Sequence, residues 1–255
     1  MSTQIGLYQP LNTLKPIDEN IWIVDGSEIK FSELGMKIPF STRMVIVRLG
    51  NGDLFLWSPI AINENLKTEI DRLGVVKHLI SPNKIHYAFI ADWKAAYPDA
   101  IAWASPGVRD RAKSQNIDVD FDADLKDVPE PDWADEIDQM IFQGGRFMAE
   151  IVFFHKSSRT LILADLIENF ELDKVPPRWR ILFNLSGTVA PDGKMPIDLR
   201  LTYIGHKNIA RQSFKRMMKW QPQRITIAHG RCYFENAEDE LYRAFRWLNV
   251  KKPDR

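Results

Sequence analysis

The sequence predicts a layered α/β fold, and three features of its hydrophobic pattern indicate this. The first sixty residues alternate like strands, residues 44–105 run strand, helix, strand, helix, strand, and the chain closes with a helix, a strand and a helix. Strands that alternate with helices at this pace form a parallel sheet with helices on its faces. The 255 residues are enough to bury a sizeable core.

The N-terminal half supplies the strands and helices of this layer in order. Residues 20–26 and 44–60 are rich in β-branched and aromatic side chains, and Gly50-Asn51-Gly52-Asp53 between two apolar runs indicates a hairpin turn. A helix is expected over 63–73, capped by Asn63. We expect further strands at 75–80 and 100–105, with a helix over 84–97 between them.

The C-terminal half begins with a polar stretch, roughly 106–146, that we expect to be irregular, with its acidic run forming a solvated face. A second hairpin follows, with strands at 149–155 and 160–166. If Ser157 and Ser158 form its turn, Asp165 lies opposite Glu150. The remaining expected elements are helices at 176–187, 206–220 and 237–248 and a strand at 224–230.

Composition excludes several classes of protein. The 34 basic and 34 acidic side chains cancel, so no global field favours nucleic acid or a membrane as partner. No apolar run approaches the roughly 20 residues needed to span a bilayer. The first residues do not show a basic stretch followed by an apolar one, so a signal peptide is not expected. The single cysteine, Cys232, is expected to be a buried, inert thiol. We therefore expect a cytoplasmic protein.

The helix at 206–220 carries a basic stripe whose role the sequence leaves open. Its members are Lys207, Arg211, Lys215 and Lys219. A phosphate-backbone contact would use such a stripe, but zero net charge favours a solvated face neutralised by neighbouring acids. Nucleic acid is therefore not an expected partner.

Three metal-ligating side chains each follow a predicted strand. His86 comes after the strand at 75–80, Asp165 closes the second hairpin, and His229 closes the strand before Gly230. Ligands gather where strands of an α/β sheet end, and two histidines with a carboxylate can hold a divalent cation. Packing and capping would account for the same positions without any metal.

The other histidines have structural explanations. His78 lies inside a strand, where burial in the core is expected. His155 falls at the turn end of the second hairpin, about 17 Å from Asp165, and cannot share its metal. His206 begins a helix, where N-terminal capping is expected. Glu150 faces the same end as Asp165, either as a site residue or as a salt-bridged strand residue, with Arg146 as its partner.

Several segments together resemble a known family. They are IWIVDG, STRMVIVRLGNGDLFLWSPI, SPNKIHYAFIADWKAAYPDAIAWASPG, EIVFFHKSSRTLILADLIENF and ITIAHG, in this order. The resemblance, from about residue 15 to 248, is to the family called domain of unknown function 4336, which is grouped with metallo-β-lactamase-like proteins. It implies one domain over 1–255, a four-layer αββα sandwich of two mixed sheets with helices outside.

The resemblance also implies a degenerate metal site. Metallo-β-lactamase-like hydrolases generally use an HxHxDH loop, where this chain has Ser81-Pro82-Asn83-Lys84-Ile85-His86. His86 matches the last histidine of that motif, and Asp165 and His229 match the late aspartate and the final histidine. The histidine expected ahead of the second hairpin has no counterpart, since Arg146 follows Gly145. The second metal position has lost its histidines.

Two functions are compatible with this set of residues. The first is a one-metal hydrolase that holds zinc, iron or manganese through His86, Asp165 and His229. Asn83 or Glu150 completes its metal shell, a bound water is the nucleophile, and Asp165 and Glu150 are the catalytic residues. The second is a module without metal that binds a small molecule or a protein in the same cleft, through Asn83, His86, Glu150, Arg146 and Asp165. The candidate substrate-binding residues are Asn83 and Arg146. The sequence names no substrate and no oligomeric state.

Overall fold

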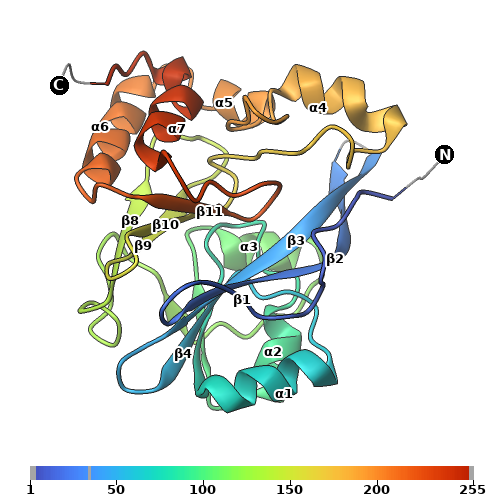
Figure 1. The fold of residues 1–255 in the computed structure, drawn as a ribbon, viewed down its shortest axis with the longest axis vertical. Coiled ribbons are helices and arrows are strands. Elements are labelled where there is room, and N and C mark those ends of the chain that lie inside the picture. Colours follow the sequence, from blue (N-terminus) through green and yellow to red (C-terminus); the bar gives the residue numbers. More distant parts are fainter. Residues whose placement is uncertain (1–3, 34–35, 253–255) are drawn as a thin grey trace. The chain divides into compact units, whose positions relative to one another are not determined.

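The computed structural model describes residues 4–33 and 36–252 and consists of two compact units (Figure 1). The N-terminal unit is Leu7–Lys126, and the C-terminal unit is Asp127–Arg255 together with Met1–Gly6. Each unit has one sheet, and each is described by itself. The expectation of a single domain over 1–255 stays a prediction.

The N-terminal unit contains a seven-stranded mixed sheet and three helices. The strands are β1 (Lys15–Asp18), β2 (Ile21–Glu33), β3 (Met36–Arg48), β4 (Asp53–Trp57), β5 (Val75–Ile80), β6 (Ile101–Ala104) and β7 (Ala123–Asp124), and the helices are α1 (Glu64–Leu73), α2 (Ile90–Ala96) and α3 (Val108–Ser114). The strands follow one another in chain order across the sheet. Pairing is antiparallel from β1 to β4 and parallel from β4 to β7, as the helical connections require.

Local sequence signals explain most of this unit. The turn at Gly50–Asp53 joins β3 to β4, and Gly52 has a φ of +91°, which glycine adopts at no steric cost. The side chain of Asn63 accepts a 2.9 Å hydrogen bond from the backbone of Leu66 and caps α1, as predicted. The helix expected over 84–97 begins only at Ile90, because the backbone around Asn83 forms a turn.

The C-terminal unit contains a four-stranded sheet with the strand order β11-β10-β9-β8. The strands are β8 (Ile137–Phe142), β9 (Glu150–His155), β10 (Thr160–Leu163) and β11 (Arg224–Ile227), and the helices are α4 (Arg180–Ser186), α5 (Ile197–Leu201), α6 (Lys207–Met218) and α7 (Ala237–Ala244), with 3₁₀ turns at Pro177–Trp179 and Arg246–Leu248. Antiparallel β8, β9 and β10 are joined by β11, which runs parallel to β10. Phe142, Leu163, Phe214 and Phe245 belong to the core of this unit.

The prediction of an irregular stretch at 106–146 was wrong in part. It contains α3, β7 and β8. The acidic side chains that suggested a solvated face also make specific contacts. Asp122 binds Lys94 and the backbone of Ala102, and Asp127 binds Arg216 at 2.6 Å. Polar residues that anchor short elements look the same in sequence as polar residues in a loop.

The basic stripe of α6 is partly used inside its own unit. Lys207 and Arg211 donate hydrogen bonds to the backbone carbonyls of Trp247 and Leu248, which belong to the C-terminal 3₁₀ turn. Lys215 and Lys219 are exposed. Lys207 and Arg211 therefore bind the C-terminal 3₁₀ turn through its carbonyl groups, and not through the neighbouring acids that the sequence suggested.

No helix in the described part of the chain is long and apolar enough to cross a membrane.

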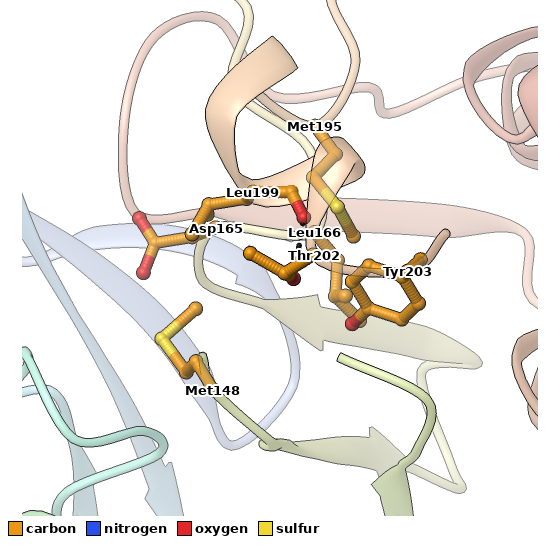
Figure 2. A pocket seen from close by; sticks show the side chains of 7 residues that line it. All are labelled: Met148, Asp165, Leu166, Met195, Leu199, Thr202 and Tyr203. Carbon is orange, nitrogen blue, oxygen red and sulfur yellow. Dashed lines mark hydrogen bonds between the residues drawn. The ribbon is translucent and has the colours of Figure 1, made fainter. Parts of the chain in front are cut away.

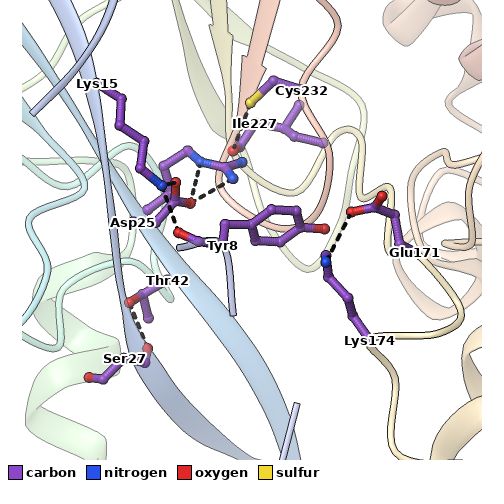
Figure 3. Close-up of polar contacts among 10 residues, drawn as sticks. Tyr8, Lys15, Asp25, Ser27, Thr42, Glu171, Lys174, Ile227 and Cys232 are labelled. Atoms are coloured by element: carbon purple, nitrogen blue, oxygen red, sulfur yellow. Dashed lines mark hydrogen bonds and ion pairs between the residues drawn. The ribbon is translucent and has the colours of Figure 1, made fainter. Parts of the chain in front are cut away.

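A buried ion cluster anchors the first strands of the N-terminal unit (Figure 3). Asp25 accepts from the guanidinium of Arg43 at 2.6 and 2.9 Å and from the ammonium of Lys15 at 2.8 Å. The Arg43 guanidinium lies 5.1 Å from the centre of the Tyr8 ring. Asp25 and Arg43 are both nearly inaccessible to solvent.

We expect Asp25→Ala to destabilise the protein by about 3–5 kcal/mol, because it leaves the buried charge of Arg43 without its carboxylate. Denaturation by urea measures this loss. The control is Asp124→Ala, which breaks the exposed pair with Arg109 and should cost less than about 1 kcal/mol. Equal losses in the two variants would contradict the prediction.

Candidate functional site

Asp165 is positioned by a carboxylate that binds its backbone. Thr160 of β10 pairs with His155 of β9, and the pairing runs on to Ile162 opposite Phe153, in the register that the sequence predicts. The carboxylate of Glu150 accepts hydrogen bonds from the backbone N–H groups of Ala164 and Asp165, both at 2.8 Å. Glu150 is buried. The predicted hairpin register is confirmed, and both Glu150 oxygens hold the chain at the point where Asp165 leaves the strand.

His229 reaches Asp165 through the parallel pairing of two strands. Leu163 of β10 lies opposite Ile227 of β11, so Asp165 and His229 each follow that pair by two residues. The Nε2 atom of His229 is 3.5 Å from Oδ1 of Asp165. The imidazole stacks at 13° on the ring of Phe170, which restricts its orientation.

Gly230 makes the turn after His229 possible. Its φ is +94°, and a Cβ there would lie 2.2 Å from the carbonyl oxygen of Asn169. Asn169 donates its backbone N–H to the carbonyl of His229 at 3.2 Å. Any side chain at Gly230 would therefore displace His229, which is why the IAHG sequence ends in glycine.

Glu168 is a site residue that sequence reasoning missed. It lies three residues beyond Asp165, is 6% exposed, and its backbone N–H binds the carbonyl of Lys194. Burial raises its pKa well above the ordinary glutamate value, and the charges of Asp165, Asp198 and Glu150 add to this effect. The apolar neighbours of Glu168 in ADLIENF were the only signal of its burial.

A small apolar pocket adjoins Asp165 (Figure 2). It has room for about one water molecule. Burial and the charge of Glu150 raise the pKa of Tyr203, so the phenol stays protonated. The lining residues are Met148, Asp165, Leu166, Met195, Leu199, Thr202 and Tyr203.

His86 lies in the N-terminal unit, in the loop after β5. Its Nδ1 atom is 2.8 Å from the hydroxyl of Ser58, which follows the neighbouring strand β4. Its ring lies against Trp57, with centroids 6.3 Å apart. A histidine whose Nδ1 is engaged by a hydrogen-bond partner can present only Nε2 to a metal, and the partner fixes the orientation of the ring.

Asn83 is fully buried and shapes the His86 loop. Its side-chain oxygen accepts from the backbone of Ile85 at 3.0 Å, and its carbonyl accepts from the backbone of His86 at 3.2 Å and the hydroxyl of Ser81 at 3.0 Å. These bonds give Asn83 a structural role. Its contact with a substrate stays a prediction.

Arg146 is exposed in the C-terminal unit. Its guanidinium lies 3.3 Å from Nε2 of His206, and its backbone N–H binds the carbonyl of Thr202. The expectation that the His206 side chain caps α6 was wrong, because it makes no capping hydrogen bond. A substrate contact of Arg146 stays a prediction.

The remaining histidines and the cysteine are structural. His78 is buried and accepts from the indole N–H of Trp103 at 3.2 Å. His155 lies beside Ser158 at the hairpin turn, remote in the register from Asp165. Cys232 is buried, with its sulfur 4.0 Å from the carbonyl of Ile227 (Figure 3).

The C-terminal unit thus brings together Asp165, His229, Glu150 and Glu168, while the N-terminal unit holds His86 and Asn83. A family model described as "Domain of unknown function (DUF4336)" matches residues 18–184. The chain belongs to this family. No curated protein matches the chain.

The chain is also similar to solved structures with the metallo-β-lactamase fold. The metallo-β-lactamase FIM-1 from Pseudomonas aeruginosa, in its mono-zinc form, matches with a TM-score of 0.61 at 11% identity, over 97% of each chain. A metallo-β-lactamase from Pontibacter korlensis gives 0.57 at 11% identity over 94% of this chain and 99% of its own. The αββα metallo-β-lactamase-like fold class predicted from the sequence is confirmed.

A metal-soaked flavodiiron core from Synechocystis also matches, with a TM-score of 0.61 at 12% identity, over 96% of this chain and 62% of that one. At 11–12% sequence identity, the similarity to these structures shows a shared fold alone.

We expect Glu150→Gln to lower the free energy of unfolding by about 1–3 kcal/mol, because an amide offers a donor where the backbone of Ala164 or Asp165 needs an acceptor. Chemical denaturation with a chelator present measures this. The half-exposed Glu171→Gln serves as the control and should change stability by less than about 0.5 kcal/mol. A Glu150 variant as stable as the control would show that the carboxylate does not hold the strand end.

The raised pKa of Glu168 predicts how stability depends on pH. The pKa of Glu168 is higher in the folded state than in the unfolded state, so the unfolded state releases this proton at a lower pH. The contribution of Glu168 to folding stability is therefore fully present below the ordinary glutamate pKa and is lost as pH rises through the folded-state pKa. In the metal-free protein, the free energy of unfolding of Glu168→Gln should therefore increase relative to that of the native chain as pH rises. Urea unfolding from about pH 5 to pH 8 measures this. Parallel curves for the two proteins would contradict it.

Proposed function

We propose that the protein is a hydrolase with a single divalent cation, held by His86, Asp165 and His229. The observation that carries this proposal is the pairing of Asp165 with His229 at 3.5 Å at the ends of two parallel strands. An imidazole nitrogen and a carboxylate oxygen so close together suit one divalent ion. His86 would be the third ligand, through Nε2, because its Nδ1 is engaged with Ser58.

The chemistry of the donors fits zinc, iron or manganese. Three protein ligands with an open position are the usual count for a catalytic zinc. Among the similar structures, one is a mono-zinc form and another is a flavodiiron core. The carboxylates of Asp165 and Glu150 are both buried, and a bound cation would offset their negative charge. A bound cation would supply Lewis acidity, lowering the pKa of water and polarising the group under attack.

The chain's own residues would then orient the attacking water, transfer protons and bind the substrate. Asp165 would orient the attacking water and accept its proton, and Glu150 holds Asp165 in position through the backbone. Glu168, whose pKa is raised by burial and by neighbouring carboxylates, would donate a proton to a leaving group. Arg146, which is exposed, would bind an anionic group of the substrate, and Asn83 holds the loop that carries His86.

We propose a small-molecule ester, thioester or phosphodiester as the substrate class and the cytoplasm as the location. Each of these compounds has an electrophilic centre that water attacks with Lewis-acid assistance. Hydrolysis of representatives of the three classes by zinc-, iron- and manganese-loaded protein tests this. Turnover of one class that Asp165→Ala abolishes supports the proposal.

We expect the native chain to bind about one zinc ion, and His86→Ala, Asp165→Ala and His229→Ala each to weaken binding at least tenfold, because each removes one of three ligands. Elemental analysis and calorimetric titration of chelator-treated protein measure stoichiometry and affinity. His206→Gln is the control, since His206 lies beside Arg146 and should leave zinc binding unchanged.

Two outcomes would contradict this prediction. Two tightly bound ions per chain would show that the second metal position survives. Equal, negligible binding by the native chain and all variants would favour the alternative function, a binding module without metal.

A further inference from the structure

Exposed apolar side chains of the C-terminal unit gather on two short helices. Of the eleven large hydrophobic residues exposed in the described part of the chain, seven lie between Leu172 and Ile204. Ile181 and Leu185 of α4 are 74% and 72% exposed. The six that lie on or next to the two helices are called here the α4–α5 patch: Ile181, Leu182, Leu185, Ile197, Leu201 and Ile204.

The two helices form one surface. The guanidinium of Arg200 in α5 donates to the carbonyl of Ser186 at the end of α4, at 3.2 Å, and the helices lie side by side in Figure 1. Of α4 only Phe183 is buried, where its ring meets Phe170 edge-on with centroids 4.8 Å apart. One side chain anchors the helix, and the others face solvent. Contiguous exposed apolar side chains on a folded protein mark an interaction surface.

The charged side chains of α4 and of the 3₁₀ turn before it are positive, and the nearest acidic residues in sequence are Asp173 and Asp192. Residues 175–191 include Arg178 and Arg180 but no aspartate or glutamate, in a chain whose net charge is zero. Trp179 lies between the two arginines, and the Arg178 guanidinium is 5.5 Å from the centre of its ring. In α5, Asp198 and Arg200 balance. Basic and aromatic side chains next to exposed leucine and isoleucine are typical of helices that lie in a membrane interface.

A second copy of the chain is a poorer occupant of this surface. Two copies related by a two-fold axis place the same patch against itself, so one interface would contain Arg178 and Arg180 from both copies. An anionic surface would instead neutralise them. Lipid headgroups supply that charge, and the acyl boundary below them takes up apolar side chains to a depth of about 5–10 Å.

We propose that the α4–α5 patch docks the protein onto the surface of an anionic lipid bilayer. The association is peripheral, because no helix in the described residues could span a membrane. This differs from the expectation of no membrane partner, which rested on charge averaged over the chain. The inference is independent of the proposed hydrolase activity and of any metal. It also places the pocket beside Asp165 near the lipid, since Leu199 of α5 lines it.

Sedimentation of chelator-treated full-length protein with lipid vesicles tests the proposal. Vesicles contain either phosphatidylcholine alone or equal parts of phosphatidylcholine and phosphatidylglycerol. The native chain should sediment with the mixed vesicles, and less so at high salt. The double variant Ile181→Ser, Leu185→Ser should bind at least about tenfold more weakly, since it removes the two most exposed side chains of the patch.

The matched control is Val75→Ser, which removes a side chain that is 65% exposed in the N-terminal unit and should bind as the native chain does. If the double serine variant does not fold, Arg178→Gln with Arg180→Gln should weaken binding to the mixed vesicles and reduce its salt dependence.

Native protein that sediments with neither vesicle overturns the proposal, as does a double variant that binds like the native chain. A dimer in analytical ultracentrifugation that the double variant abolishes, without vesicle binding, would assign the patch to a second copy.

Discussion

The carboxylate of Glu150 bridges the backbone N–H groups of Ala164 and Asp165, and the geometry of the C-terminal half of the site depends on that contact. A buried carboxylate is costly unless donors satisfy it, and two backbone donors at 2.8 Å do so. The bond ends β10 at a fixed point. Because β11 runs parallel to β10 in register, the same point fixes His229 next to Asp165. One buried side chain thereby positions Asp165 and His229, which are 64 residues apart in sequence.

This arrangement gives a physical reason for a single metal position. The three proposed ligands are each supported by a neighbour: Asp165 by Glu150, His229 by Phe170, and His86 by Ser58. Where the family resemblance places a second metal, Asn83 uses its side-chain oxygen within its own loop, and Arg146 brings a positive charge to the chain ahead of β9. An amide engaged in this way and a guanidinium are poor replacements for imidazole ligands. These residues therefore explain why we propose one metal position and not two.

The fold was predictable where local signals agree with tertiary structure. The turn at Gly50–Asp53, the Asn63 cap and the pairing of His155 with Thr160 all follow from short-range rules, and all are observed. The late start of α2 was not predictable, because it depends on hydrogen bonds of the buried Asn83 side chain. Glu168 escaped notice for a similar reason: an acidic residue in a loop looks solvated, and only the fold shows it buried near Asp165.

We propose that His86, Asp165 and His229 ligate the same cation, and X-ray absorption spectroscopy of the zinc-loaded chain can test this. Imidazole ligands give a multiple-scattering pattern whose strength reports how many bind the metal. We expect two imidazoles and no sulfur in the native chain, and one imidazole in His86→Ala at a zinc concentration that restores occupancy. A native spectrum with a single imidazole, or a count of two that His86→Ala leaves unchanged, would contradict it.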